Sequence, residues 1–307
     1  MVTPTLPRGA MVALVTPTTP AGEVDPGALD RLVGHVVAGG VAGISPCGST
    51  GEGVRLTSEQ RLDVTARVVE RSSGLPVIAG VPMLALPDAE GELADLGSLG
   101  ATAALVAPPG YFPMSDAEVE NLYLRLADAS PVPLVLYNIP AFTRIPLSVH
   151  VVARLARHEN IVGLKDSSRD LEYLQSLVAA IGDDEVIDFR IYTGTDTMLV
   201  ASALAGADGS IAASANLVPD LGVQILNLVS TDLRRAIELQ RRLSAIVASC
   251  RRGTPPAGWK AALSLLGLCD PAPVPPALPL AADAMERLRY EMREAAVLGS
   301  TEARASG

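Results

Sequence analysis

The chain has 307 residues, of which 49% are hydrophobic and 19% are charged, and its formal net charge is −10 at pH 7. This composition indicates a globular protein with a sizeable core, and the negative charge argues against nucleic acid or an anionic membrane as the main partner. The three cysteines are widely spaced without a CxxC pair, which argues against a structural zinc site and favours a reducing compartment. No signal peptide or membrane span is recognisable, so we expect a cytoplasmic protein.

Short apolar segments that end in glycine, proline, serine or aspartate alternate with longer amphipathic segments along the chain. The amphipathic segments predict helices, and two of them, residues 57–73 and 115–130, begin at Thr57 and Ser115, which are typical N-cap residues. The apolar segments predict strands at residues 11–17, 42–46, 76–81, 103–107, 134–138, 161–165, 189–194 and 208–213.

Eight strands that alternate with helices predict an α/β fold, the (β/α)8 TIM barrel, rather than an open doubly wound sheet. A dinucleotide-binding sheet would need GxGxxG after its first strand, and the segment VTPTTPAGEVD lacks that motif. We expect residues 1–230 to form the barrel, residues 231–298 to form a C-terminal helical extension packed on it, and residues 299–307 to be a disordered tail. The extension is predicted from helical patterns at about residues 232–250, 257–267 and 280–297.

In a TIM barrel the catalytic residues lie at the carboxyl ends of the strands and in the loops that follow them. Lys165 ends the apolar strand IVGLK, and it is one of only two lysines among 24 basic residues. A lysine in a barrel interior is desolvated, which disfavours the ammonium form, and a neutral amine can attack a carbonyl to form a Schiff base. The alternative is a structural lysine that extends its amine to solvent or forms an ion pair, for example with the adjacent Asp166. The second lysine, Lys260, begins a C-terminal helix beside Trp259, where we expect packing and solvent exposure.

Two further strand ends carry groups suited to carbonyl chemistry, whereas no carboxylate and histidine cluster predicts a metal site. The turn CGSTGEG, residues 47–53, could hold a carboxylate or a phosphate on its N–H groups and hydroxyls, and it lacks the GK[ST] of a nucleotide site. The alternative is a tight connection whose glycines adopt positive φ. Tyr137 in LYNIP can transfer protons, or else be an ordinary rim residue, and Tyr111 in PGYFP has a weaker claim.

In this order and on these strands, GSTGEG, YNIP, GLKD and AGADGSIAASAN resemble the dihydrodipicolinate synthase / N-acetylneuraminate lyase family over about residues 9 to 270. The resemblance implies a TIM barrel with a C-terminal helical extension, assembled as a homo-oligomer (tetramer or dimer). It also implies a class I aldolase or lyase that forms a Schiff base between a lysine and pyruvate or another 2-oxo acid. Neither a metal nor an organic cofactor is implied.

Carried over residue by residue, the resemblance makes Lys165 the Schiff-base lysine and Tyr137 the tyrosine that moves protons around it. Ser49 and Thr50, which follow Gly48 in the glycine-rich turn, match the pair that binds the carboxylate of the 2-oxo acid, and Ser49 also relays protons to Tyr137.

Two further matches are positional. Tyr111 corresponds to a relay tyrosine that a neighbouring subunit often supplies, and Ile211 falls where a backbone carbonyl lies near the Schiff base. Candidates for contacting substrate hydroxyls are Thr143, Asp196 and Thr197.

The substrate depends on positions where the chain departs from both branches of that family. The synthase branch has an arginine two residues after YNxP and a glycine two residues further, and these places hold Phe142 and Arg144. The sialic acid branch has an acidic residue after GxD and a hydroxyl late in the eighth strand, where this chain has Thr197 and Ala213. We therefore expect first a lyase or aldolase for a 2-keto-3-deoxy sugar acid or a similar hydroxy-oxo acid.

Several alternatives stay open. One is a 4-hydroxy-tetrahydrodipicolinate synthase, which condenses pyruvate with aspartate semialdehyde, with Arg144 reaching the place of the missing arginine. The others are an N-acetylneuraminate lyase, a phosphate-binding isomerase or epimerase, and a non-catalytic 2-oxo acid sensor. A sensor would be expected to lose Lys165 or Tyr137, and both are present.

Overall fold

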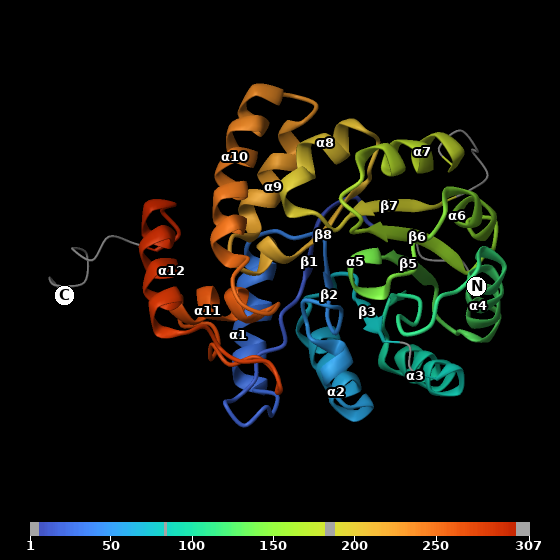
Figure 1. Cartoon of the computed structure of the whole chain (residues 1–307), viewed down its shortest axis with the longest axis horizontal. Helices are drawn as coiled ribbons and strands as arrows, with labels where there is room; N and C mark the ends of the chain where they lie inside the picture. The colour runs from blue at the N-terminus through green and yellow to red at the C-terminus, as the bar shows by residue number, and fades with distance from the viewer. Residues whose placement is uncertain (1–5, 83–84, 182–187, 299–307) are drawn as a thin grey trace, which may run out of the picture.

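A computed structural model describes residues 6–82, 85–181 and 188–298, so the predicted disordered tail lies outside the described residues (Figure 1). Each of the eight predicted strands corresponds to one observed strand. The first ends at Ala13 rather than at residue 17, because the Val15 N–H donates to the Asn216 side chain (2.9 Å) instead of to a neighbouring strand. The strands are β1 Gly9–Ala13, β2 Gly43–Ser45, β3 Ile78–Val81, β4 Ala103–Val106, β5 Leu134–Asn138, β6 Ile161–Asp166, β7 Arg190–Thr193 and β8 Gly209–Ala212.

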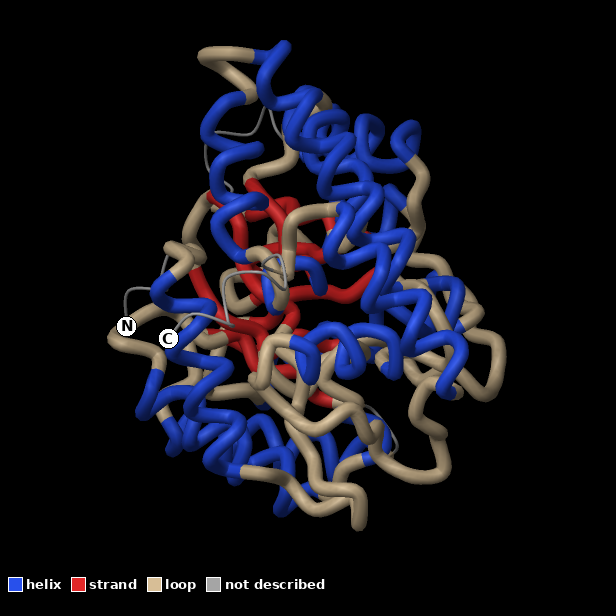
Figure 2. Tube along the Cα trace, turned by 90° about the vertical axis from the view of Figure 1, so that its left-hand side faces the viewer, coloured by secondary structure: helices blue, strands red, loops and turns tan. Residues whose placement is uncertain are grey.

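The eight strands form one parallel sheet in the order β2-β1-β8-β7-β6-β5-β4-β3. Its two edges meet, since Ile44 of β2 forms a parallel bridge with Val77 and the Gly80 N–H of β3 donates to the Pro46 carbonyl at 2.9 Å. Figure 2 shows the strands at the centre with helices around them. The predicted (β/α)8 TIM barrel is therefore confirmed.

Several of the helices between the strands, namely α1, α2, α4 and α6, begin where a side-chain cap satisfies one of their first N–H groups. Thr57 with Gln60, and Ser115 with Glu118, form reciprocal capping boxes at the two predicted helix starts. The α-helices that lie between the strands, together with α9 after β8, are α1 Pro26–Ala38, α2 Ser58–Arg71, α3 Leu86–Leu99, α4 Asp116–Ala129, α5 Pro140–Thr143, α6 Val149–Leu155, α7 Leu171–Ile181, α8 Leu199–Leu204 and α9 Pro219–Leu228.

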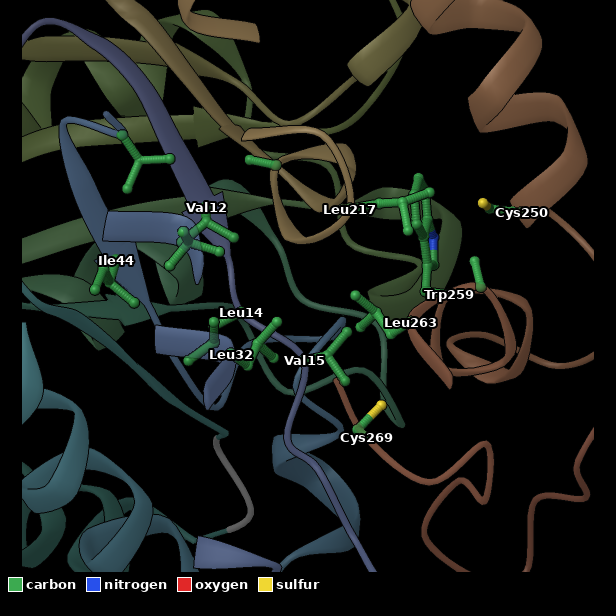
Figure 3. Close-up of a cluster of buried hydrophobic side chains, with 14 of the residues drawn as sticks. Val12, Leu14, Val15, Leu32, Ile44, Leu217, Cys250, Trp259, Leu263 and Cys269 are labelled. Carbon is green, nitrogen blue, oxygen red and sulfur yellow. The ribbon is translucent and has the colours of Figure 1, made fainter. Parts of the chain in front are cut away.

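Three helices follow α9, as the sequence predicts, namely α10 Leu233–Cys250, α11 Ala257–Leu265 and α12 Ala282–Glu294. They lie on one side of the barrel, with α10 beside α9 and α12 outermost (Figure 1). Trp259 and Leu263 of α11 belong to the same hydrophobic cluster as Val12 of β1 and the neighbouring Leu14 (Figure 3). The division of the chain at residue 230 stays a prediction. No helix in the described ranges is long and apolar enough to cross a membrane.

The expectation that Lys260 is exposed to solvent was wrong. Its side chain is fully buried, and its Nζ lies 2.7 Å from Glu52 Oε2, donates to Thr18 Oγ1 at 2.7 Å and to the Ala272 carbonyl at 3.0 Å. Burial lowers the pKa of Lys260, and the Glu52 carboxylate opposes that effect. The pair ties the loop after β2 to α11, whereas the neighbouring Trp259 packs in the core as expected.

Candidate active site

A cavity of about 570 Å³ opens at the carboxyl ends of the strands, where a TIM barrel carries its catalytic groups. Its wall combines residues from six different strand ends with residues that follow α10. The strand-end residues include Ser49, Thr50, Tyr137, Lys165, Gly194 and Ile211. A second cavity of about 460 Å³ shares Ser49 and Tyr137 with the first and extends towards Gly48.

Lys165 is a buried basic residue that lines the larger cavity. It is 3% exposed, and the sheet register places it between Tyr137 of β5 and Tyr192 of β7. Its Nζ lies 4.4 Å from the centre of the Tyr137 ring, an electrostatically favourable distance for a cation over an aromatic face. Gly194 leaves room for the side chain, because a Cβ there would lie 2.9 Å from Lys165 Cε.

Asp166, the alternative ion-pair partner of Lys165, is engaged elsewhere. Its Oδ1 accepts from Asn138 Nδ2 at 2.7 Å and from the Ser168 N–H at 3.2 Å, and its Oδ2 accepts from Ser168 Oγ at 2.9 Å. Burial raises the pKa of the Asp166 carboxyl, and these hydrogen bonds partly offset that effect. Within the described ranges Lys165 Nζ has no ion-pair partner, so the structure does not support the ion-paired alternative.

Tyr137 and Ser49 form a hydroxyl pair above the lysine. The two oxygens lie 2.9 Å apart, and either group can donate, so a proton can pass in both directions. Tyr137 is 5% exposed, which keeps its phenol in a partly dehydrated environment. The structure thus brings together the amine and the two hydroxyls that the sequence singled out, with the Thr50 side chain on the same wall.

The glycines of the turn CGSTGEG do not adopt the positive φ that a simple tight connection was expected to need. The residues with positive φ are Cys47 (56°) and Glu52 (57°), not the glycines. The glycines are needed for close approach instead, because a Cβ on Gly53 would lie 1.9 Å from the Cys47 carbonyl oxygen and one on Gly51 would lie 2.8 Å from the Leu14 oxygen. Glu52 is anchored by Lys260, which fixes the turn that carries Ser49.

The predicted substrate-contacting residues divide into two groups. Asp196 and Ile211 line the larger cavity, and Asp196 Oδ1 accepts from the Ser214 N–H at 2.6 Å. Thr143 lines the smaller cavity, but its hydroxyl is bonded to the backbone of Ile139 and Ile145, which leaves it poorly placed to bind a substrate hydroxyl.

Three predicted residues line neither cavity in the described part of the chain. Arg144 is exposed, Thr197 follows Asp196 in a short 3₁₀ turn, and Tyr111 is 89% exposed. The Tyr111 ring packs edge-to-face on Phe112 with ring centres 5.0 Å apart. A single chain therefore does not bring Tyr111 to the lysine.

The sequence did not reveal several residues that line the larger cavity. Ser167 and Ser168 directly follow Lys165 and Asp166, so the strand-end rule could have included them. The sequence pattern did not single out the other four residues, because three of them are arginines in a chain with many arginines and the fourth lies on a helix after the barrel. They are Arg169, Arg251, Arg252 and Trp259. Among the described residues no group of three histidine, cysteine, aspartate or glutamate side chains is placed to hold a metal ion.

Comparison with known proteins identifies the family. A model of the dihydrodipicolinate synthetase family matches residues 6–295. The chain belongs to this family. The dihydrodipicolinate synthetase family consists of class I aldolases and lyases that form a Schiff base on a lysine, so the chain is an enzyme of this kind acting on a small molecule. The predicted family is confirmed, as is the predicted enzyme class.

Relatives within the family are similar over nearly their whole length. A 4-hydroxy-tetrahydrodipicolinate synthase of Hyphomonas neptunium is 37% identical over 267 residues, which cover 86% of this chain and 90% of the relative. The pyruvate complex of a dihydrodipicolinate synthase from Acinetobacter baumannii has a TM-score of 0.90 and 30% identity, covering 95% of this chain and 99% of that one. YagE, a prophage protein of E. coli K12 solved with pyruvate, has a TM-score of 0.90 at 26% identity, covering 95% and 99%.

Proposed function

We propose that the chain condenses pyruvate with an aldehyde through a Schiff base on Lys165, as a 4-hydroxy-tetrahydrodipicolinate synthase that takes aspartate semialdehyde. The observation that carries this proposal is the placement of the two lysines. Lys260 is paired with Glu52 and lines neither cavity, whereas Lys165 lies in the cavity without an ion-pair partner among the described residues. The names of the relatives favour this substrate pair over the sugar acid that the sequence placed first.

The geometry supports the following sequence of steps. The neutral Lys165 amine attacks the C2 carbonyl of pyruvate, and loss of water gives a protonated imine. The imine withdraws electrons, so the C3 proton can pass to the Tyr137 oxygen and the resulting enamine carbon can attack the aldehyde carbon. The aldehyde oxygen takes a proton as the C–C bond forms, and water then hydrolyses the imine to release the product and restore the Lys165 amine. Tyr137 donates and accepts the protons of the carbinolamine, and its bond to Ser49 supplies the path by which those protons reach and leave it. The hydroxyl and N–H groups of Ser49 and Thr50 receive the pyruvate carboxylate.

Trapping the imine tests the chemistry directly. Borohydride reduction in the presence of pyruvate, followed by peptide mass spectrometry, should place a reduced pyruvyl group on Lys165 and leave the Lys260 peptide unmodified. Lys165→Ala serves as the matched control, and it should show no adduct and no condensation. If no 2-oxo acid gives an adduct on Lys165 and Lys165→Arg keeps full activity, the proposed mechanism is wrong.

A second candidate function is cleavage of a 2-keto-3-deoxy sugar acid. Phe142 favours it, because this side chain lines both cavities at the position where the synthase branch has an arginine. Asp196 and Ser167 would then face the hydroxyls of the substrate. Pyruvate release from a panel of 2-keto-3-deoxy acids, compared with consumption of pyruvate and aspartate semialdehyde, distinguishes the two candidates. The candidate with the larger kcat/KM is retained.

We also infer that the chain forms a homo-oligomer. Tyr111 (89% exposed), Phe112 (74%) and Val54 (70%) are large apolar side chains that are unusually exposed for a monomer surface. An oligomer contact through these residues would cover them and could bring the Tyr111 phenol to a neighbouring cavity. Light scattering on the wild type and on Phe112→Ser tests this inference, since a monomeric wild type would contradict it.

A further inference from the structure

Two arginines line the same cavity as Lys165, and the proposed catalytic steps assign no role to either of them. Arg169 lies in the loop after β6, and Arg251 follows the last residue of α10, so they approach the cavity from different parts of the fold. Both side chains belong to exposed residues. The Arg169 backbone has φ of 67°, in the left-handed region that favours glycine, and strain of this kind concentrates at functional sites.

These two arginines carry their charges without an ion pair to any of the described residues. No ion pair or hydrogen bond joins either guanidinium to another residue of the described ranges, whereas the neighbouring Arg252 donates to both oxygens of Glu291 at 2.7 and 2.8 Å. Partial burial lowers the pKa of Arg251, and repulsion from the Arg169 charge lowers it further. Attraction to the Asp196 carboxylate raises this pKa and so opposes both effects. Asp196 is the acidic residue on this wall, and its Oδ1 is bonded to the Ser214 N–H.

Two like charges that line one cavity, with no ion-pair partner in the described part of the chain, favour the binding of an anion there. A guanidinium binds carboxylate or phosphate oxygens through paired N–H donors, and such bonds are stronger than those between neutral groups. The wall of the same cavity also carries the apolar side chains of Phe142 and Trp259. A ligand that reaches from Lys165 to the two arginines would have an electrophilic carbon at the lysine and an anionic terminus at the exposed guanidinium groups.

We propose that Arg169 and Arg251 form an anion subsite for the acidic terminus of the aldehyde that condenses with pyruvate. The proposal rests on the proposed function, because it assigns the second substrate of the same cavity. It places recognition of that terminus on the loop after β6 and on the end of α10, rather than on α5, which contains Phe142 and is followed by the exposed Arg144.

Steady-state kinetics with Arg169→Gln and Arg251→Gln tests the subsite. With aspartate semialdehyde, each variant should lose about tenfold in kcat/KM, the effect expected for one charge-assisted contact in a partly exposed site. With propanal, which carries no anionic group, the loss should be less than about twofold, because propanal cannot use such a contact. Arg241→Gln, a charge change at an exposed arginine of α10 that lines neither cavity, is the matched control and should behave as wild type.

A trapping measurement in each variant separates this proposal from the proposed function. Wild type and both variants should trap pyruvate on Lys165 equally, and absence of trapping in the wild type would count against the Schiff base itself. Equal losses with aspartate semialdehyde and propanal, or no loss with either, would overturn the subsite. Glyceraldehyde 3-phosphate provides the phosphate arm, and a selective loss with this aldehyde alone would assign the subsite to phosphate rather than carboxylate.

Discussion

The buried pair between Glu52 and Lys260 allows a quantitative prediction about stability. Neither side chain is exposed, and their charged atoms lie 2.7 Å apart. Lys260→Met would leave the Glu52 carboxylate with the Val274 N–H and the Arg55 guanidinium, each donating to its Oε1 at 2.9 Å. Glu52→Gln would leave the ammonium with one hydroxyl and one carbonyl and no anion.

The loss of stability in each single variant is limited, because the group left unpaired can exchange a proton with solvent and become neutral. An unpaired buried lysine can lose its proton, and at pH 7 neutralising an ordinary lysine costs about 4.6 kcal/mol, whereas protonating an ordinary glutamate costs about 3.7 kcal/mol. Breaking a buried pair by removing one partner typically costs about 3–5 kcal/mol. We therefore expect losses of about 4 kcal/mol for Glu52→Gln and about 3 kcal/mol for Lys260→Met, which keeps Arg55.

Urea unfolding at pH 7 measures these losses, and the double variant supplies the control. Glu52→Gln with Lys260→Met removes both charges, so the free energy of unfolding should fall by at least about 2 kcal/mol less than the sum of the single losses. Losses that add, or single losses below about 1 kcal/mol, would show that the pair does not anchor the turn after β2 and would refute the reasoning.

The remaining predictions concern the catalytic groups and a buried thiol. Tyr137→Phe keeps the ring beside Lys165 but removes the hydroxyl, so kcat should fall by about 10²–10⁴ in steady-state assays while folding, followed by circular dichroism, is unchanged. Gly194→Ala places a Cβ 2.0 Å from Ser167 Oγ and should lower kcat/KM at least about tenfold, with partial recovery when Ser167 becomes glycine. Burial raises the pKa of Cys47 to about 12, so at pH 8 about one thiol in 10⁴ is ionised, against about a quarter for a free cysteine. A colourimetric thiol reagent should therefore label Cys47 only after unfolding, and rapid labelling of the native protein would contradict this.

The grouping of the candidate site residues was predictable from the sequence because parallel strands place their carboxyl ends on one face of the barrel. The strands that carry these residues, β2, β5 and β6, end at a recognisable change from apolar to proline or polar residues, so Lys165, Tyr137 and Ser49 could be placed together without coordinates. The amphipathic helices were predictable for the same local reason, since Thr57 and Ser115 cap their own helices.

Contacts between distant segments were not predictable, because nothing in the local pattern specifies them. Lys260 lies on a helix whose sequence is compatible with exposure, and only the fold brings Glu52 to it. Arg251 is one of many arginines, and the local pattern does not show that the end of α10 reaches the cavity. The substrate likewise depends on the whole wall of the cavity, which the departures at Phe142, Arg144, Thr197 and Ala213 do not specify.

The segment from Cys250 to Trp259 has a consequence for how such enzymes can diversify. It contributes part of the cavity wall, yet it lies outside the eight strands that hold the amine and the hydroxyl pair. Substitutions there can change which molecule is accepted while the bond-making groups stay as they are. A chimera that carries this segment from a relative with another substrate would inherit the donor's selectivity and keep the host's reactive lysine.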